Sequence, residues 1–270
     1  MSKVFGTSPY IVEILTPRQS EQDFESALTR FRERYNRIVE EGHVVSVPDN
    51  PMGSLHFTAL EVLQYEELPV RPDQFLLHLN SFHRKVDFDD MLEQADSLGV
   101  RNILCISGDG GPRLPKLEPE DLGFDTKAVT AVELLRYIES SFPGRFTLGV
   151  AFNQYEPLDH ELAKLDSKIA AGARFVATQP VIGEDAAIRE LLGRDMPVYL
   201  GAWMSRKIHL LEDCVGYPMG DALEGYNPEE NLRRLHRLYK PDGFYLSLLA
   251  FRKAWEDVLM SRAELVSGGS

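Results

Sequence analysis

Eight short apolar segments, rich in β-forming residues, recur along the chain and constrain its fold more than any other feature. Most of them run into a loop of polar residues or glycine, as Asn102–Asp109 does where its apolar stretch meets Ser107 and Gly108. Short, continuously apolar runs are typical of strands buried on both faces of a parallel sheet. The predicted strands are Tyr10–Leu15, Val44–Val47, Phe75–Asn80, the beginning of Asn102–Asp109, Phe146–Phe152, Phe175–Gln179, Pro197–Gly201 and Phe244–Leu249.

Segments with helical spacing lie between these strands. Their apolar side chains return at intervals of three and four residues, which indicates amphipathic helices. We expect helices over Phe24–Ile38, Phe88–Leu98, Val129–Ile138, Leu158–Ile169 (ending near a C-cap at Gly172), Leu232–Leu238 and Phe251–Met260.

Alternation of strand and helix either closes into a barrel or opens into a doubly wound sheet. Eight repeats favour a single-domain α/β fold, the (β/α)8 TIM barrel, over residues 1–265, with residues 266–270 as a disordered tail. A doubly wound dinucleotide fold is disfavoured because no G-x-G-x-x-G motif follows the first strand.

Composition excludes several classes of protein. The 270 residues are 43% hydrophobic and 26% charged, and no apolar run reaches the roughly 20 residues that cross a bilayer. A net charge of −13 repels nucleic acid, and the arginine clusters are interleaved with acids as on a solvated helix face. Two cysteines and an N-terminus without an apolar leader predict a cytoplasmic protein. We expect neither a membrane nor a nucleic acid among its partners.

The ends of the predicted strands supply the candidate site. In TIM barrels the substrate lies against the C-terminal ends of the strands, so a list of strand ends is also a list of candidate site residues. These residues are Glu13, Asp49, Asn50, His78, Asn80, Asp109, Asn153, Gln154 and Gln179.

Two acids among them are candidates for chemistry. Glu13 interrupts an apolar strand, where removal from water would raise its pKa and let it act as a general acid near neutral pH. The alternative is an exposed carboxylate on the other face of an edge strand. Asp109 lies between two glycines, which suits close approach of a ligand and equally suits a plain turn.

Other chemistry-bearing residues give weaker signals. His78 lies in the apolar run FLLHLN, where it is either a satisfied core histidine or a ligand contact. No metal is expected, because His78 and His83 lack the companions of a zinc site. Neither Cys105 nor Cys214 lies in a nucleophile motif. Without a G-x-S-x-G elbow, a P-loop or a kinase motif, hydrolases and nucleotide kinases are disfavoured.

Five motifs in chain order resemble the methylenetetrahydrofolate reductase family. They are Glu13 followed by Pro17-Arg18, the strand HLN at His78, the strand end SGD at Asp109, the helix KLDSKIAAGARF at 164–175, and the pair Thr178-Gln179. The family's counterparts are E-F-F-P-P-[RK], a histidine-bearing H-L strand, R-G-D, R-K-v-d-A-G-A and T-Q. The resemblance covers residues 10–185 and then fades.

The resemblance implies a TIM barrel that reduces 5,10-methylenetetrahydrofolate to 5-methyltetrahydrofolate, with FAD along the strand ends and hydride from NADH or NADPH. By position, Glu13 matches the family's proton donor, Asp109 the acid between folate and flavin, and Gln179 the amide that binds the pterin. Asp109 and Gln179 would therefore contact substrate. The implied cofactor contacts are His78, Asn80, Asp109, Phe152, Gln154, Glu161 and Lys168.

The chain departs from the family pattern where the flavin would bind. Ser107 stands where R-G-D has its arginine, and Phe152-Asn153-Gln154-Tyr155-Glu156 replaces a turn that ends in histidine. Pro48-Asp49-Asn50 replaces a run with a threonine hydroxyl. Each lost charge-assisted hydrogen bond removes about 1.5–3 kcal/mol of binding, so the flavin contacts are thinned.

The sequence thus predicts a reductase-like oxidoreductase of one-carbon metabolism and methionine biosynthesis, acting on a folate with NAD(P)H and bound FAD. One alternative discards the flavin and passes hydride directly from NAD(P)H to the folate. A second is a non-catalytic folate- or flavin-binding subunit that needs a partner protein. The choice of nicotinamide, a homo-oligomer or partner subunit, the direction of reaction and the one-carbon carrier stay open.

Overall fold

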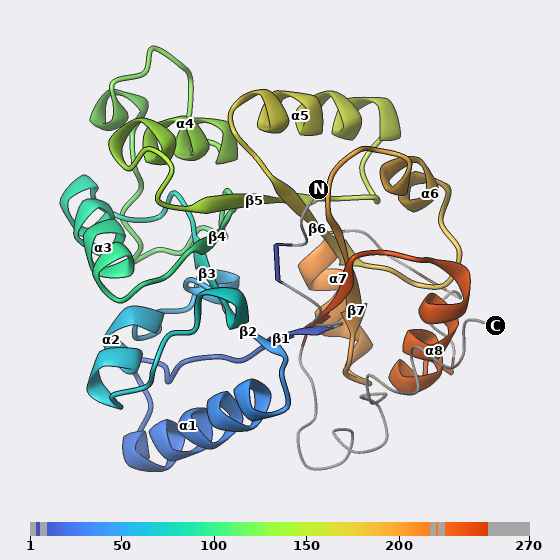
Figure 1. The fold of residues 1–270 in the computed structure, drawn as a ribbon, viewed down its shortest axis with the longest axis horizontal. Helices are drawn as coiled ribbons and strands as arrows, with labels where there is room; N and C mark the ends of the chain where they lie inside the picture. The colour runs from blue at the N-terminus through green and yellow to red at the C-terminus, as the bar shows by residue number, and fades with distance from the viewer. Residues whose placement is uncertain (1–3, 6–9, 217–219, 221–224, 248–270) are drawn as a thin grey trace.

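Eight parallel strands pair in sequence order and close on themselves in the computed structural model, which describes residues 4–5, 10–216, 220 and 225–247 (Figure 1). Every neighbouring pair is parallel, including the closing pair of the first and last strands. The strands are β1 (Tyr10–Glu13), β2 (Val44–Val47), β3 (Phe75–Leu79), β4 (Asn102–Cys105), β5 (Thr147–Phe152), β6 (Phe175–Pro180), β7 (Val198–Trp203) and β8 (Gly243–Ser247). The predicted (β/α)8 barrel is confirmed.

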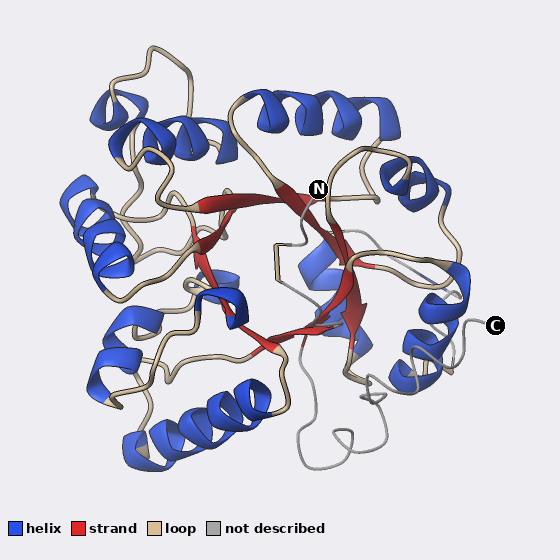
Figure 2. Ribbon diagram, viewed as in Figure 1, coloured by secondary structure: helices blue, strands red, loops and turns tan. Residues whose placement is uncertain are grey.

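Helices follow the strands and surround the ring of strands (Figure 2). The α-helices are α1 (Phe24–Glu40), α2 (Ala59–Tyr65), α3 (Lys85–Ser97), α4 (Ala131–Ser141), α5 (Leu158–Ala170), α6 (Ala186–Leu192), α7 (Ile208–Val215) and α8 (Pro228–Leu238). Three short 3-10 turns are η1 (Pro51–Gly53), η2 (Pro72–Gln74) and η3 (Pro119–Leu122). The expected helix Phe251–Met260 and tail 266–270 lie outside the described residues.

Local sequence signals set several helix starts. Thr58 and Glu61 form a reciprocal capping box at α2, and Thr130 and Glu133 do the same at α4. Such boxes satisfy backbone N–H groups that have no partner within the helix. The helices α2, α6 and α7 were not among those expected from periodicity. Each spans only about two turns, which is too short for a clear 3.6-residue pattern.

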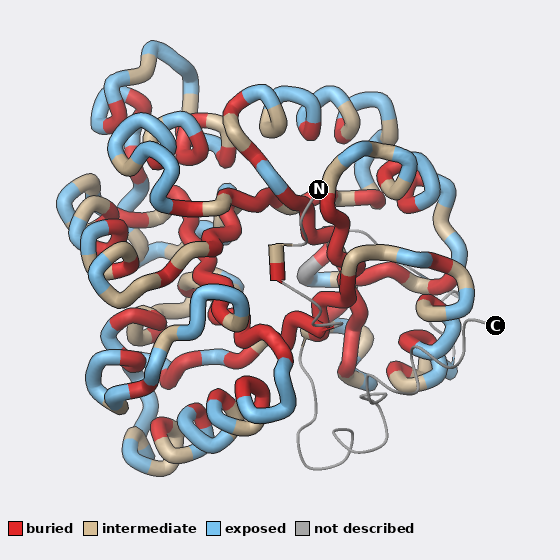
Figure 3. Tube along the Cα trace, viewed as in Figure 1, coloured by how far each residue is buried: buried red, intermediate tan, exposed pale blue. Residues whose placement is uncertain are grey.

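Side chains alternate between the two faces of the closed sheet and build two hydrophobic layers. Outward residues such as Val12, Leu77 and Val150 pack with the helices, while inward residues fill the barrel. The inward cluster contains Phe5, Ile11, Val44, Leu76, Leu104, Phe175, Ala177, Tyr199 and Tyr245. Figure 3 shows the result, a ring of buried strands inside helices whose outer faces are exposed. The interior is therefore a packed core over much of its length.

Phe175 fills the barrel interior because its register partner on the neighbouring strand β5, Gly149, has no side chain. A Cβ atom at Gly149 would lie 2.1 Å from Cζ of the Phe175 ring. Phe175 also packs edge-on against Phe5 and Tyr199, with ring centroids 5.5 and 5.9 Å away. Gly149 is thus required by close packing.

We expect Gly149→Ala to lower the free energy of unfolding by about 1–3 kcal/mol, because the added methyl group overpacks the barrel interior. The double variant with Phe175→Leu should lose less than the sum of the two single variants, since the smaller side chain admits the methyl group. Urea unfolding of the four proteins measures this coupling. Purely additive losses would contradict it.

Candidate active site

Glu13 is the last residue of β1 and lies at the C-terminal end of the barrel. It has the same inward direction as Ile11, two residues earlier, which packs in the interior cluster. Tyr245 of β8 donates a hydrogen bond from its hydroxyl to Oε2 of Glu13 over 2.8 Å. The carboxyl group therefore points into the barrel, and the alternative of an exposed carboxylate on an edge strand does not hold.

Two further polar residues extend this contact into a buried network. The Ser46 hydroxyl lies 3.1 Å from the Tyr245 hydroxyl and 2.8 Å from Nε2 of His78. Nε2 of His78 also lies 3.2 Å from the Tyr245 hydroxyl. Both Ser46 and His78 are buried, and Ser46 is the register partner of Glu13 on the neighbouring strand. Four strands thus contribute one polar side chain each.

Burial sets the protonation of this network. Desolvation raises the pKa of Glu13 to about 7, and the hydrogen bond from Tyr245 opposes the shift. Desolvation lowers the pKa of His78 to about 3, so its ring is neutral at pH 7. Desolvation and the neighbouring Glu13 raise the pKa of Tyr245 well above its ordinary value, so its hydroxyl keeps its proton. A carboxyl that titrates near neutral pH is suited to general acid catalysis.

The raised pKa of Glu13 makes folding depend on pH. The folded chain holds this proton more tightly than the unfolded chain, so the contribution of Glu13 to stability is lost as pH rises from about 4.5 to about 7. We expect Glu13→Gln to be more stable than the wild type at pH 8 by on the order of 2–3 kcal/mol, and nearly equal at pH 4. Urea unfolding at both pH values tests this, and an equal difference at both would contradict it.

Asp109 follows β4 and anchors a neighbouring loop at the same end of the barrel. Its Oδ2 accepts a hydrogen bond from the backbone N–H of Met52 over 2.9 Å. The two loops touch closely, since a Cβ atom at Gly53 would lie 2.4 Å from the carbonyl oxygen of Gly110. Asp109 itself is exposed. Its carboxylate thus makes a structural contact and is accessible from outside, and contact with a ligand stays a prediction.

Asn80 directly follows β3, and its side chain holds the neighbouring loops by hydrogen bonds. Its side-chain amide donates to the backbone oxygen of Asp49 over 2.8 Å, and its Oδ1 accepts from the N–H of Phe82. Oδ2 of Asp49 in turn lies 2.7 Å from Nε2 of His83. Asn80 is fully buried. The structure therefore places Asn80 behind the mouth as a support for the loops.

Gln179 and Gln154 lie side by side at the ends of β6 and β5. The side-chain amide of Gln154 donates 3.0 Å hydrogen bonds to the backbone oxygens of Gln179 and Pro180, while its buried Oε1 accepts none from the described residues. Gln179 has the inward direction of Phe175 and Ala177 and is partly exposed. Its side-chain amide forms no hydrogen bond with the described residues. Gln179 is therefore free to contact a ligand.

Glu161 and Lys168 lie together in a separate cavity of about 430 Å³ next to the ends of β4 and β5. Nζ of Lys168 lies 3.6 Å from Glu161 and donates to the backbone oxygen of Ala151. Nζ of Lys164 lies 3.2 Å from Glu161, whose other oxygen accepts from the N–H of Asn153. Burial lowers the pKa of Lys168, and Glu161 opposes this shift. The buried glutamate is thus the centre of an ion-pair cluster.

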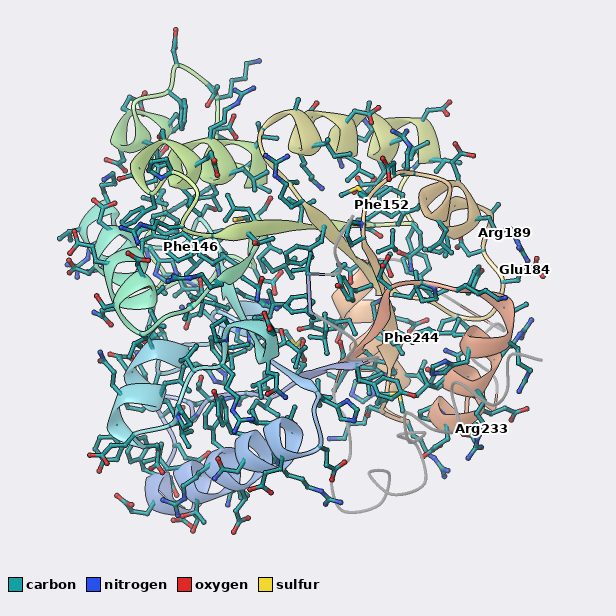
Figure 4. All side chains as sticks on the ribbon, in the orientation of Figure 1. Phe146, Phe152, Glu184, Arg189, Arg233 and Phe244 are labelled. Atoms are coloured by element: carbon teal, nitrogen blue, oxygen red, sulfur yellow. The ribbon has the colours of Figure 1, made fainter. Side chains whose placement is uncertain are left out.

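Phe152 lies neither in the network around Glu13 nor in the cavity beside Glu161. Its side chain belongs to the outer layer of the core and has no exposed surface. Figure 4 shows it labelled on the side of the barrel covered by α5 and α6. The strand alternation explains this position, because Phe152 shares the outward face of β5 with Leu148 and Val150.

Sequence reasoning missed Ser46 and Tyr245. Ser46 is the polar residue of the strand VVSV and lies two residues from the inward Val44. Tyr245 lies in the strand GFYLS and belongs to the inward cluster. The alternation of side chains along a strand would have indicated both residues once the inward face of each strand was assigned. Strand ends alone were too narrow a criterion.

Two features are absent from the described part of the chain, a metal-binding cluster and a membrane-spanning helix. Within it, no three His, Cys, Asp or Glu side chains gather closely enough to hold a metal ion. Nor does any described helix combine the length and apolar character needed to cross a membrane.

Fold and site together define a (β/α)8 barrel with an acid of raised pKa at its C-terminal mouth. Residues 7–189 match the family model of methylenetetrahydrofolate reductase. The chain belongs to this family.

Named relatives agree with this assignment. The chain is 30% identical over 189 residues to a probable methylenetetrahydrofolate reductase (NADPH) of Caenorhabditis elegans, covering 63% of this chain and 26% of that protein. It is 31% identical over 138 residues to methylenetetrahydrofolate reductase 2 of Saccharomyces cerevisiae, covering 46% and 22%. The chain therefore spans about a quarter of the length of the curated relatives it matches.

A solved structure shares the fold over nearly the whole chain. It is an uncharacterized protein from Clostridium thermocellum described as binding two copies of 5-methyl-5,6,7,8-tetrahydrofolic acid. The TM-score is 0.62 with 11% sequence identity, and the match covers 92% of this chain and 91% of that one. At this identity the likeness concerns the fold.

Proposed function

We propose that this protein reduces 5,10-methylenetetrahydrofolate to 5-methyltetrahydrofolate with NADH or NADPH as the source of hydride. The observation that carries the proposal is Glu13, a carboxyl group with a pKa of about 7 at the mouth of the barrel. Family membership supports the reaction, and the relative from C. elegans is named for NADPH. The structural neighbour binds a 5-methyltetrahydrofolate, which is the product of this reaction.

Glu13 would act before the hydride arrives. Its proton passes to a nitrogen of the five-membered folate ring, the bond between that nitrogen and the methylene carbon breaks, and a reactive iminium forms. Hydride from the reduced nicotinamide then adds its electron pair to this carbon and gives the methyl group. The balance is one proton and one hydride consumed for each folate reduced. A pKa near the working pH lets Glu13 give up this proton and regain it.

Gln179 and Asp109 would hold the folate next to Glu13. The side-chain amide of Gln179 offers a donor and an acceptor, which matches the hydrogen-bonding edge of a pterin. Asp109 supplies an exposed carboxylate after β4 at the same end of the barrel, held in place by the N–H of Met52. We assign both residues to substrate binding and Asp109 also to electrostatic support of the iminium.

The residues of the cavity next to β4 and β5 do not fit tightly bound FAD, the cofactor that the sequence resemblance implies. The cavity is lined by two lysines, Lys164 and Lys168, and by two glutamates, Glu156 and Glu161. Glu161 already pairs with both lysines, so the cavity offers no net positive charge to a diphosphate. We therefore favour direct transfer of hydride from NAD(P)H to the folate.

The absorbance spectrum of the purified protein separates these two routes. We expect no bound yellow chromophore, together with oxidation of NADH or NADPH that depends on methylenetetrahydrofolate. Stoichiometric flavin in the native protein would contradict the favoured route and restore the flavin-dependent one. Folate binding without turnover with either nicotinamide would instead support a non-catalytic subunit that needs a partner protein.

Glu13→Gln tests the role of the acid. The variant keeps the size and the hydrogen-bonding capacity of the side chain but has no proton of suitable pKa to give. We expect folate affinity near that of the wild type and a kcat lowered about 10²–10⁴-fold. Calorimetric folate titration and stopped-flow measurement of NAD(P)H oxidation supply the two numbers.

Glu93→Gln is the matched control, because Glu93 is exposed on α3 outside the site. This control should keep wild-type turnover. Wild-type turnover in Glu13→Gln as well would remove Glu13 from the mechanism.

A further inference from the structure

We propose that Tyr245 is a positioning residue for Glu13, and that Ser46 and His78 allow its hydrogen bond to reverse direction when Glu13 gains or loses a proton. The expected effect on kinetics rests on the proposed function. The expected effect on the proton of Glu13 depends only on the hydrogen bonds among these four side chains. None of the five motifs that resemble the reductase family contains Tyr245 or Ser46.

The geometry gives Tyr245 the central place in the network. Its hydroxyl lies 2.8 Å from Oε2 of Glu13, 3.1 Å from Oγ of Ser46 and 3.2 Å from Nε2 of His78. A phenol has one proton to donate and can also accept, so it can satisfy only one of these groups as a donor at a time. The choice of that group depends on which neighbour needs the proton most.

When Glu13 is ionised, the phenol donates to the carboxylate, and Ser46 donates to Nε2 of His78 over 2.8 Å. His78 can accept because its ring is neutral, with the proton on Nδ1. The two hydroxyl groups, Oε2 of Glu13 and Nε2 of His78 then each have a hydrogen-bond partner. The carboxylate receives a hydrogen bond inside the barrel that solvent does not need to supply.

When Glu13 is protonated, its own O–H donates to the phenol oxygen over the same 2.8 Å contact. The phenol proton then turns toward Ser46 or Nε2 of His78, which lie 3.1 and 3.2 Å from the phenol oxygen. The network remains satisfied without movement of heavy atoms. Hydrogen bonds kept in both protonation states stabilise the folded chain, because an unpaired buried polar group costs about 1–3 kcal/mol of folding free energy.

The polar side chains of the network lie at one level of the barrel, next to apolar inward residues. Toward the N-terminal end, the inward side chains are apolar or aromatic, as at Ile11, Val44 and Leu76. Tyr199 of β7 is also inward, but it packs among Phe5 and Phe175. Tyr245 therefore has a role that its aromatic neighbour Tyr199 cannot share, which makes Tyr199 a matched control.

Tyr245→Phe keeps the ring and removes the hydroxyl, so it tests the proposal directly. Without a donor to the carboxylate, Glu13 should hold its proton more tightly. We expect its titration midpoint to rise by about one pH unit, while Tyr199→Phe leaves it unchanged. Carbon NMR of protein labelled at the glutamate carboxyl carbon measures the midpoint, and the signal lost in Glu13→Gln assigns it. This readout needs no turnover.

Kinetics provide the second readout. A general acid must be protonated to act, so kcat falls at alkaline pH as Glu13 loses its proton. In Tyr245→Phe this fall in kcat should shift to higher pH, by the same amount as the titration midpoint of Glu13. KM for the folate should stay near the wild-type value, because Tyr245 acts through Glu13. If the wild type shows no folate reduction while the NMR shift is present, the proposed function fails and the network stands.

Ser46→Ala supplies a second variant in case Tyr245→Phe does not fold. Without the serine hydroxyl, Nε2 of His78 loses its donor and competes with the Glu13 carboxylate for the phenol proton, so the Glu13 midpoint should move in the same direction by a smaller amount. An unchanged midpoint in Tyr245→Phe, or an equal shift in Tyr199→Phe, would overturn the proposal. If only Ser46→Ala folds, an unchanged midpoint there would overturn it.

Discussion

Closure of the barrel between its first and last strands is the constraint on which the site depends. Pairing of β1 with β8 sets Ile11 opposite Tyr245, although 234 residues separate them in sequence. That register brings the Tyr245 hydroxyl to Glu13 at the C-terminal mouth. The packed layer below, with Phe175 seated over Gly149, holds the strands in this register. The hydrogen bond between Tyr245 and Glu13 at the mouth is thus a consequence of the pairing between the first and last strands.

Burial and hydrogen bonding act on Glu13 in opposite senses. Desolvation alone favours the neutral acid, and the phenol favours the carboxylate, so the balance leaves the pKa near 7. A fully exposed carboxyl would be ionised at this pH and could give no proton, while a buried one without a donor would give it up reluctantly. His78, kept neutral by its burial, adds an acceptor without adding a competing charge. The arrangement fits a group that must cycle between two protonation states.

Much of the fold follows from local pattern, and the site follows only in part. All eight strands were predicted because continuous apolar runs, such as those of β3 and β6, are typical of strands buried on both faces of a parallel sheet. Helices α2 and α6 were missed because two turns carry too little periodicity. Glu13 was predicted because it interrupts an apolar run, whereas Tyr245 reads as an ordinary aromatic core residue. Its role depends on the β1–β8 pairing, which no local segment encodes.

The sequence resemblance implies FAD as the cofactor, whereas the charges in the cavity beside Lys164 and Lys168 do not favour it. The chain belongs to the methylenetetrahydrofolate reductase family, yet Glu161 neutralises the lysines beside it. The barrel mouth, with Glu13 and Gln179, is therefore where we expect the folate to bind. A crystal structure with bound 5-methyltetrahydrofolate tests it most directly. We predict the pterin against Gln179, with a nitrogen of the former five-membered ring within hydrogen-bonding distance of Glu13. Folate bound only in the cavity beside Lys164 and Lys168, away from Glu13, would contradict the account.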